Sequence, residues 1–284
     1  MNIDSVKEVV QSNGYRKVLV LLPAGLMADA GELARVIPEP VFLSNPCYGA
    51  CDVPLHLLDR LKVDAVFNFG HSRPIGLKYP GNVHFFEVQL RDVPEFVPDF
   101  HRVGLVFVIQ YRDVVGEYAK KLERAGKEVV MGGRPDFMAT YPAQVTGCDV
   151  GAARRILDKV DGFVVACDGI FHAGAVAALG KPTFNWFGER ADPPRFPVAA
   201  LFTAEKVGVL VGLKPGQNYE KEAVLVKDKL ESLGKKVIMI VGDIITPEVR
   251  NFRVDFWVNA SCPRISEEKY LSPSAPVKEV LKYL

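Results

Sequence analysis

Short runs of consecutive apolar residues recur along the whole chain and alternate with amphipathic segments. The runs are rich in Val, Ile and Phe. Continuous rather than alternating apolarity is typical of strands covered on both faces, as in a parallel sheet between helices. We therefore predict an α/β fold, with strands at 17–23, 40–44, 64–70, 82–88, 104–110, 128–133, 162–167, 182–187, 207–213, 237–242 and 255–260.

Two amphipathic segments, 113–126 and 218–234, have the pattern of helices, and each ends in a glycine, as a helix C-terminus prefers. A strand follows each of them at once. The order strand, helix, strand, turn, helix, strand occurs three times, which indicates an internal repeat. We predict three similar Rossmann-like units with parallel sheets, at 1–96, 97–196 and 197–284, with boundaries near two proline-rich segments.

The repeat places a cysteine at matching points. Asp64 and Asp161 each open an apolar strand and lie 13 residues after Cys51 and Cys148. In the third unit the matching strand begins at Asp255, and its cysteine, Cys262, follows the strand's far end instead. Ligands of parallel sheets gather beyond the carboxyl ends of the strands. We therefore expect the three thiols to lie at these edges and to converge on one point if the edges face inward.

The composition and charge of the chain argue against nucleic-acid-binding, membrane and secreted proteins. The chain has 284 residues, of which 49% are hydrophobic and 24% charged, and 35 basic residues balance 34 acidic ones. No strong net field attracts nucleic acid or a membrane surface. The N-terminal segment lacks the apolar core of a signal peptide, and no apolar stretch approaches a membrane span, so we expect a cytoplasmic protein. The glycine fingerprints of Rossmann and P-loop nucleotide sites are absent.

Five cysteines without a secreted pattern favour reduced thiols or metal ligation over disulfides. Thiolate ligands suit zinc or an iron-sulfur cluster. Zinc is disfavoured, because structural zinc sites normally draw on two tight ligand pairs and only Cys47 and Cys51 are closely spaced. A four-iron cluster with three cysteine ligands would leave one iron open for substrate. Cys167 ends an apolar strand, which favours core packing, and Cys47 is a spare ligand or a bystander.

Several motifs resemble the archaeal diphthamide-synthesis enzymes, the family of 3-amino-3-carboxypropyl transferases that act on elongation factor 2. The resemblance covers almost the whole chain in the same order. The motifs are YGACD at 48–52, GHS at 70–72, QVTGCDVGAA at 144–153, DGIFHAGAVAALGKP at 168–182, VGLKPGQ at 211–217 and SCPRIS at 261–266.

The resemblance implies three α/β units around a central 4Fe-4S cluster, with Cys51, Cys148 and Cys262 as its ligands. It also implies an unusual S-adenosylmethionine radical reaction, in which the Cγ–S bond breaks, methylthioadenosine leaves, and the 3-amino-3-carboxypropyl radical adds to C2 of a histidine on elongation factor 2. An electron donor and a homodimer are further implications. Residues in matching motifs that are candidates for binding S-adenosylmethionine are Gln217, Gln110, Gln144, His172 and Arg264.

The chain also departs from the family pattern. Arg73 and Pro74 follow the GHS motif, where the family pattern leads us to expect different residues. The third unit also ends at Leu284, soon after its cysteine, whereas relatives often continue. A paralogue that uses the same radical on another acceptor is therefore one alternative. Others are a quinolinate synthase-like enzyme, which also has three units and a three-cysteine cluster, and a non-catalytic subunit that maintains a partner's cluster. His71 is either a packing residue or a neighbour of the cluster.

Overall fold

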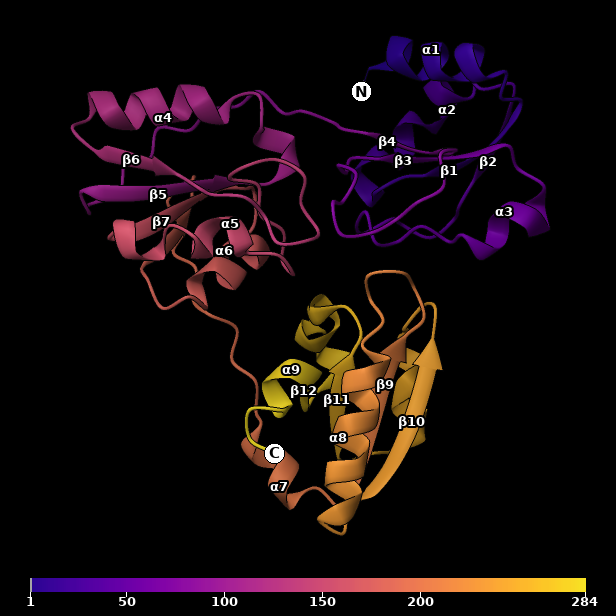
Figure 1. The fold of residues 1–284 in the computed structure, drawn as a ribbon, viewed down its shortest axis with the longest axis vertical. Helices are drawn as coiled ribbons and strands as arrows, with labels where there is room; N and C mark the ends of the chain where they lie inside the picture. The colour runs from indigo at the N-terminus through magenta and orange to yellow at the C-terminus, as the bar shows by residue number, and fades with distance from the viewer. Residues whose placement is uncertain (1) are drawn as a thin grey trace. The chain divides into compact units, whose positions relative to one another are not determined.

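The computed structural model describes residues 2–284, apart from the side chain of Glu267. The chain divides into two compact units, Met1–Pro193 and Pro194–Leu284. Figure 1 shows that the first unit contains two sheets and the second contains one. All three sheets have four parallel strands, which confirms the predicted α/β class. The domain boundaries at 96/97 and 196/197 stay a prediction.

The first sheet has the strand order β2-β1-β3-β4. Its strands are β1 (Lys17–Leu21), β2 (Glu39–Phe42), β3 (Ala65–Phe69) and β4 (Val83–Phe86). The helices of this part are α1 (Ile3–Asn13), α2 (Ala30–Leu33), α3 (His56–Leu61) and the 3-10 helix η1 (Ala24–Asp29). The two central strands are fully buried apart from Lys17, because apolar clusters cover both faces of the sheet.

The second sheet repeats this order as β6-β5-β7-β8. Its strands are β5 (Arg102–Phe107), β6 (Glu128–Met131), β7 (Gly162–Ala166) and β8 (Thr183–Asn185). The helices are α4 (Val115–Arg124), α5 (Gly151–Arg154), α6 (Ile170–Ala177) and the 3-10 helices η2 (Ile109–Tyr111) and η3 (Leu157–Lys159).

The third sheet has the order β10-β9-β11-β12. Its strands are β9 (Lys206–Gly212), β10 (Lys236–Gly242), β11 (Phe256–Ala260) and β12 (Ser274–Pro276). The helices are α7 (Ala199–Thr203), α8 (Glu220–Ser232), α9 (Val277–Val280) and the 3-10 helices η4 (Pro247–Phe252), η5 (Pro263–Glu267) and η6 (Lys269–Leu271). Three sheets with one strand order confirm that the chain contains similar units.

An aspartate fixes the same strand junction in each sheet. The carboxylate of Asp64 accepts hydrogen bonds from the backbone amides of Arg16 and Lys17, both at 2.8 Å, where β1 begins. Asp161 accepts from the amide of Arg102 at the start of β5, at 2.9 Å. Asp255 accepts from the amides that open β9, at 3.1 and 2.8 Å. The repeated aspartate therefore joins the starts of the two central strands in each of the three sheets.

In the second and third sheets, a glycine on one central strand is paired with a large aromatic residue on the other. Gly104 pairs with Phe163, and Gly208 pairs with Trp257. A Cβ added at Gly104 would lie 2.6 Å from the Phe163 ring, and one added at Gly208 would lie 2.8 Å from the Trp257 ring. A large ring on one strand thus fills the space left by glycine on its neighbour, as close packing of interiors requires.

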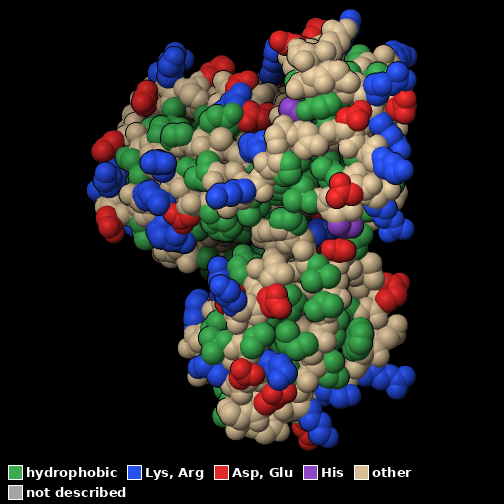
Figure 2. All heavy atoms as spheres, turned by 45° about the vertical axis from the view of Figure 1, so that its right-hand side comes forward, with side chains coloured by type: hydrophobic (Ala, Val, Ile, Leu, Met, Phe, Trp, Pro, Cys, Tyr) green, Lys and Arg blue, Asp and Glu red, His purple; other side chains and the backbone are tan. Residues whose placement is uncertain are grey.

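On the face shown in Figure 2, acidic and basic side chains are interspersed, in agreement with their balanced numbers. Among residues 2–284, no helix has the length and apolarity needed to cross a membrane.

Candidate functional site

Cys51 lies in the loop that connects β2 to α3, beyond the carboxyl end of its strand. A Cβ at Gly49 would lie 3.2 Å from the Cys51 sulfur, so the glycine lets the backbone come close to the thiol. The Asp52 carboxylate accepts a hydrogen bond from the amide of Tyr48 at 3.1 Å, which closes the loop on itself. The thiol is therefore held by a tight, internally bonded turn.

Tyr79 is hydrogen-bonded to the loop that carries Cys51. Its hydroxyl donates to the carbonyl oxygen of Ala50 at 2.7 Å, and its side chain is buried. Burial raises the pKa of Tyr79 well above its ordinary value, and the nearby thiols of Cys51 and Cys47 add to this effect. Tyr79 is consequently a neutral hydrogen-bond donor that anchors the cysteine loop.

Cys47 is part of the hydrophobic core of the first sheet, with 2% of its surface exposed. The side-chain amide of Asn68, on β3, donates to the Cys47 sulfur at 3.3 Å. The amide oxygen of Asn68 lies 2.8 Å from Nδ1 of His71. Asn68 therefore connects the start of the cysteine loop to the histidine that follows β3.

His71 is held as a neutral imidazole. Its pKa is lowered to about 4, mainly by burial and to a smaller extent by the charge of a protonated His172. His172 lies near the start of α6, in the part of the unit that carries the second sheet. The fold thus brings these two histidines, 101 residues apart in sequence, within electrostatic reach of each other.

Cys148 occupies the matching place in the second sheet, in the loop between β6 and α5. The Thr146 hydroxyl lies 3.4 Å from its sulfur. A Cβ at Gly147 would lie 2.1 Å from the ring of Phe171, so this glycine lets α6 pack directly on the cysteine loop. Cys51 and Cys148 therefore both lie in glycine-containing loops at carboxyl edges, as the sequence predicted.

Asp149 organises the loop around Cys148. Its carboxylate accepts backbone hydrogen bonds from Gly151 and from residues 136–139, at 2.7 to 3.3 Å. Burial by itself raises the pKa of this carboxyl, but the backbone donors outweigh burial and the resulting pKa is below the ordinary value. The segment before Cys148 is therefore fixed by a charged, fully bonded side chain.

Gln144 and Gln110 both bind the loop that follows β3. The Gln144 oxygen accepts from the amides of Thr140 and Tyr141 at 2.9 and 3.0 Å, and its amide donates to the Ser72 hydroxyl at 2.8 Å. The Gln110 amide donates to the carbonyl oxygen of Gly70 at 2.9 Å. Both side chains thus tie the two sheets of the first unit together beside the GHS motif.

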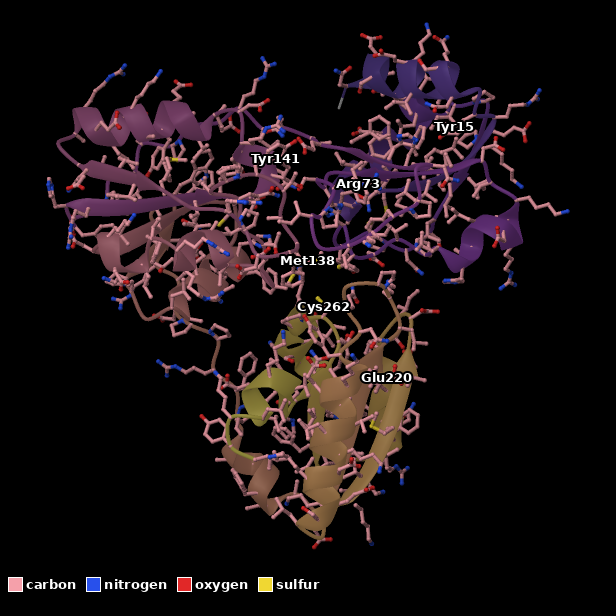
Figure 3. All side chains as sticks on the ribbon, in the orientation of Figure 1. Tyr15, Arg73, Met138, Tyr141, Glu220 and Cys262 are labelled. Atoms are coloured by element: carbon pink, nitrogen blue, oxygen red, sulfur yellow. The ribbon has the colours of Figure 1, made fainter. Side chains whose placement is uncertain are left out.

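Cys262 belongs to the second compact unit, Pro194–Leu284, which corresponds to the third predicted repeat. It follows β11 and precedes η5. Figure 3 shows it at the edge of the sheet where that strand ends. The Asn259 amide donates to the carbonyl oxygen of Cys262 at 2.8 Å, and the Asn259 oxygen accepts from the amide of Ser261 at 2.9 Å. Asn259 holds its loop from the same strand position as Asn68 does in the first sheet.

Gln217 and Arg264 lie at the same end of the second unit. Gln217 is buried in the turn between β9 and α8, where its backbone N–H donates to the carbonyl oxygens of Lys214 and Pro215 at 3.1 and 2.8 Å. Arg264 is exposed in η5, two residues after Cys262. The ligand contacts expected for these two residues stay predictions.

Cys167 is fully buried in the core of the second sheet, as the apolar strand before it indicated. Its thiol donates to the carbonyl oxygen of Gly169 at 3.0 Å, and burial raises its pKa to about 12. A thiol this hard to ionise is a poor metal ligand.

The thiols of Cys51, Cys148 and Cys262 are each suited to a soft metal or an iron-sulfur cluster rather than to a hard cation, since sulfur ligands prefer soft metals. Within the described residues, no three His, Cys, Asp or Glu side chains form a group that could hold a metal ion. Cys262 lies in a different compact unit from Cys51 and Cys148. The convergence of the three thiols therefore stays a prediction.

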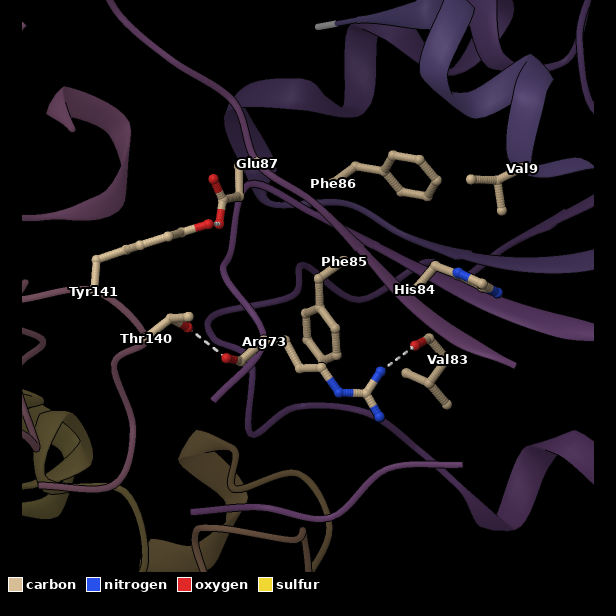
Figure 4. Close-up of a pocket in the computed structure, with 9 residues that line it drawn as sticks. All are labelled: Val9, Arg73, Val83, His84, Phe85, Phe86, Glu87, Thr140 and Tyr141. Atoms are coloured by element: carbon tan, nitrogen blue, oxygen red, sulfur yellow. Dashed lines mark hydrogen bonds between the residues drawn. The ribbon is translucent and has the colours of Figure 1, made fainter. Parts of the chain in front are cut away.

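A separate cavity of about 290 Å³ lies in the first unit along the edge strand β4 (Figure 4). The Arg73 guanidinium crosses it, donating to the carbonyl oxygens of Val83 and Tyr79 at 3.0 and 2.8 Å. On the other side, the Tyr141 hydroxyl donates to Glu87 at 2.8 Å. Arg73, which departs from the family pattern, thus stabilises the loop between β3 and β4.

Sequence reasoning missed Asn68, Asn259, Tyr79 and Asp149 as supports of the cysteine loops. A signal was present for three of them. Asn68 and Asn259 each lie four residues after the repeated strand-opening aspartate, and Asp149 directly follows Cys148 as Asp52 follows Cys51. Tyr79 carried no such signal, because it lies in an irregular segment far from the cysteines in sequence.

Comparisons with known proteins show which family the chain resembles. The family model described as "Putative diphthamide synthesis protein" matches residues 22–194 and 195–273. The 2-(3-amino-3-carboxypropyl)histidine synthase of Pyrococcus horikoshii is 28% identical, with 93% of this chain and 83% of that protein aligned. Subunit 1 of the same enzyme from Gallus gallus is 24% identical, and 90% of this chain covers 69% of its length.

The crystal structure of Dph2 from Pyrococcus horikoshii with a 4Fe-4S cluster has a similar fold. Its TM-score is 0.82 at 25% sequence identity, and the alignment covers 99% of this chain and 89% of that one. The human subunit 1 is 24% identical, and the chain spans 65% of its length. Because the family model covers most of the chain, this protein belongs to the diphthamide synthesis protein family.

Proposed function

We propose that this protein is a 2-(3-amino-3-carboxypropyl)histidine synthase that catalyses the first step of diphthamide biosynthesis. It moves the 3-amino-3-carboxypropyl group of S-adenosylmethionine to C2 of a histidine on translation elongation factor 2 and releases methylthioadenosine. The family match and the names of the relatives from Pyrococcus horikoshii and Gallus gallus support this assignment.

One observation carries the proposal. Each of the three sheets has at least one cysteine in a loop beyond the carboxyl ends of its strands, and Cys51, Cys148 and Cys262 are the ones that lie in the family's motifs. The similar Dph2 structure contains a 4Fe-4S cluster. We assign these three cysteines as the ligands of such a cluster. When bound and reduced, the cluster supplies the electron that breaks the Cγ–S bond of the sulfonium.

The protein's own residues hold and orient the reactants. Loops closed by Asp52 and Asp149 fix two thiols before a metal arrives, which reduces the ordering cost of binding. The buried Gln217, in the turn before α8, binds the amino-acid end of S-adenosylmethionine. His172 and Arg264 complete the proposed contacts, while Gln110 and Gln144 set the position of the loop after β3.

The reaction also defines the partners. Elongation factor 2 is the protein substrate, and a one-electron donor is required because the sulfonium bond is cleaved reductively. We place the protein in the cytoplasm, where the translation factor works, and propose that it acts as a homodimer.

The test is an anaerobic assay with reconstituted protein, dithionite, S-adenosylmethionine labelled in the aminocarboxypropyl group, and archaeal elongation factor 2. We expect methylthioadenosine release and label on the translation factor. Cys51→Ala, Cys148→Ala and Cys262→Ala should each lose the full iron and sulfide content and the activity. Cys167→Ser is the matched control, because this buried thiol should not bind iron.

Retention of a full cluster in the three alanine variants, with loss in a Cys47 or Cys167 variant, would overturn the ligand assignment. Turnover of dihydroxyacetone phosphate without methylthioadenosine release would support the quinolinate synthase-like alternative. Methylthioadenosine release without label on elongation factor 2 would indicate a paralogue with another acceptor. A full cluster with neither activity would indicate a subunit that serves a partner's cluster.

A further inference from the structure

The hydroxyl of Ser261 is buried and has no hydrogen-bond partner among the described residues. Ser261 directly follows β11, and 3% of its surface is exposed. Its backbone amide is already bonded to Asn259. A buried hydroxyl without a partner destabilises the folded state, so such a group in a native site calls for an explanation.

The neighbours of this hydroxyl come from three different segments. A Cβ added at Gly212, the last residue of β9, would lie 2.2 Å from the Ser261 hydroxyl oxygen and 2.9 Å from the carbonyl oxygen of Gln217. The absence of a side chain at position 212 therefore leaves room for the hydroxyl beside the turn that carries Gln217. This turn is the one proposed above to bind substrate.

The start of α8 lies against the same strand end. The amide of Tyr219 donates to the carbonyl oxygen of Ala260 at 3.3 Å, and α8 begins at the next residue, Glu220. Helix starts present backbone N–H groups and a positive partial charge. The amide of Glu220 is itself bonded to the side-chain oxygen of Asn218 at 3.0 Å. The place thus offers carbonyl oxygens, the positive partial charge of a helix start, and a hydroxyl that both donates and accepts.

Groups of both polarities in one small place match a zwitterion better than a phosphate or a base. We propose that Ser261 binds the amino-acid end of the sulfonium substrate, with its hydroxyl bonded to the ammonium or carboxylate that this end carries. The proposal rests on the function proposed above and adds a residue that the sequence motifs did not single out. Because the hydroxyl is buried and the turn at 213–217 lies beside it, we expect this turn to shift when substrate enters.

The test compares two nucleosides that differ in this end alone. S-adenosylhomocysteine has the amino-acid group, and methylthioadenosine lacks it. Binding is measured by anaerobic calorimetry on the cluster-loaded full chain and its Ser261→Ala variant. We expect roughly tenfold or more weaker binding of S-adenosylhomocysteine by the variant, the loss typical of a hydrogen bond to a charged group, and unchanged binding of methylthioadenosine.

Two controls separate binding from folding. Ser274→Ala removes another buried hydroxyl of the same unit, one that is bonded to the carbonyl oxygen of Ser266 at 3.2 Å, and should leave both affinities unchanged. Without ligand, Ser261→Ala should be at least as stable as the wild type, because it removes an unpaired buried hydroxyl. In the wild type, S-adenosylhomocysteine should slow amide hydrogen exchange in residues 213–217.

Equal affinities of the wild type and Ser261→Ala for S-adenosylhomocysteine would overturn this inference and leave the proposed function intact. The same holds if both nucleosides lose affinity equally in the variant. Failure of the wild-type protein to bind either nucleoside would overturn the proposed function together with the inference.

Discussion

Glycines at the loop bases decide how closely the functional segments approach each other. Gly147 lets the Phe171 ring pack on the loop of Cys148, and Gly212 leaves space for the Ser261 hydroxyl. In each case a single methyl group would collide with a neighbour. The positions of the loops therefore depend on the absence of side chains at a few residues.

Gly212→Ala should destabilise the protein by about 1–3 kcal/mol, the usual cost of overpacking. The new methyl would overlap the Ser261 hydroxyl oxygen, which lies 2.2 Å from its position. Ser261→Ala should recover part of this loss in the double variant, since it removes the nearest clashing atom. Urea unfolding of the wild type, the two single variants and the double variant measures this coupling. Strictly additive effects would argue against the contact.

His71 should remain neutral well below the pH at which an ordinary histidine takes up a proton. Its pKa is lowered from 6.5 to about 4, mainly by burial. Between these pH values the histidine is protonated in the unfolded chain and neutral in the folded protein. The wild type should thus lose stability as the pH falls from about 6.5 to about 4, and His71→Asn should lose less. Unfolding free energies across this pH range, measured on cluster-free protein, provide the check. Parallel pH profiles for both proteins would contradict it.

At the scale of elements, the aspartate that joins the two central strands recurs in all three sheets. Asp64, Asp161 and Asp255 each accept backbone amides at the start of the neighbouring strand. These bonds fix the starts of the two central strands of each sheet, at the end opposite to the cysteine loops. A change at this end of a sheet should therefore affect stability without altering the chemistry directly.

Asp255→Ala should destabilise the second unit by about 1–2 kcal/mol, because two backbone amides lose a charged acceptor. Asp228→Ala, on the exposed face of α8 with 67% of its side chain accessible, is the matched control and should be nearly neutral. Denaturant unfolding compares them. Equal effects of the two substitutions would show that the strand junction contributes nothing specific.

Continuous apolar runs predicted eleven of the twelve strands in the described chain. The missed strand, β12, has three residues and includes Pro276, so it has neither the length nor the composition of the others. The expected helices at 113–126 and 218–234 occur as α4 and α8, and Gly126 and Gly234 follow them with positive φ. Strand order could not be read from the sequence, because it depends on which strand edges meet in space.

The sequence predicted where the cysteine loops lie but not the polar contacts that hold them. The loops of Cys51, Cys148 and Cys262 could be placed at strand ends because each follows a recognisable apolar run. The bonding of Gln144 to Ser72, 72 residues away, could not be predicted, since it depends on how two sheets pack within one unit. Spacing along the chain thus located the thiols, whereas the polar contacts that hold them came only from three-dimensional structure.

At the scale of the whole molecule, the hydrophobic clusters of the described residues fall within one unit or the other. Calorimetry of the cluster-free protein should therefore show two thermal transitions. If all three cysteines hold one cluster, loading it should raise the temperature of both, since a ligand stabilises the folded state that binds it.

Cys262→Ala should abolish the shift of the transition that belongs to the second unit. The transition is assigned with Asp255→Ala, which should lower that temperature alone. If cluster loading raises the transition temperature of the second unit in the Cys262→Ala protein as much as in the wild type, the cluster does not depend on this thiol.

The shared strand order of the three sheets has a consequence for the origin of the protein. Three copies of one module, each with the same aspartate at the same junction, are most simply explained by duplication of an ancestral gene for a single small domain. Cys51 and Cys148 lie in matching loops of their copies, whereas Cys262 follows a different strand of the third copy. On this history, the position of the third cysteine changed after the copies arose.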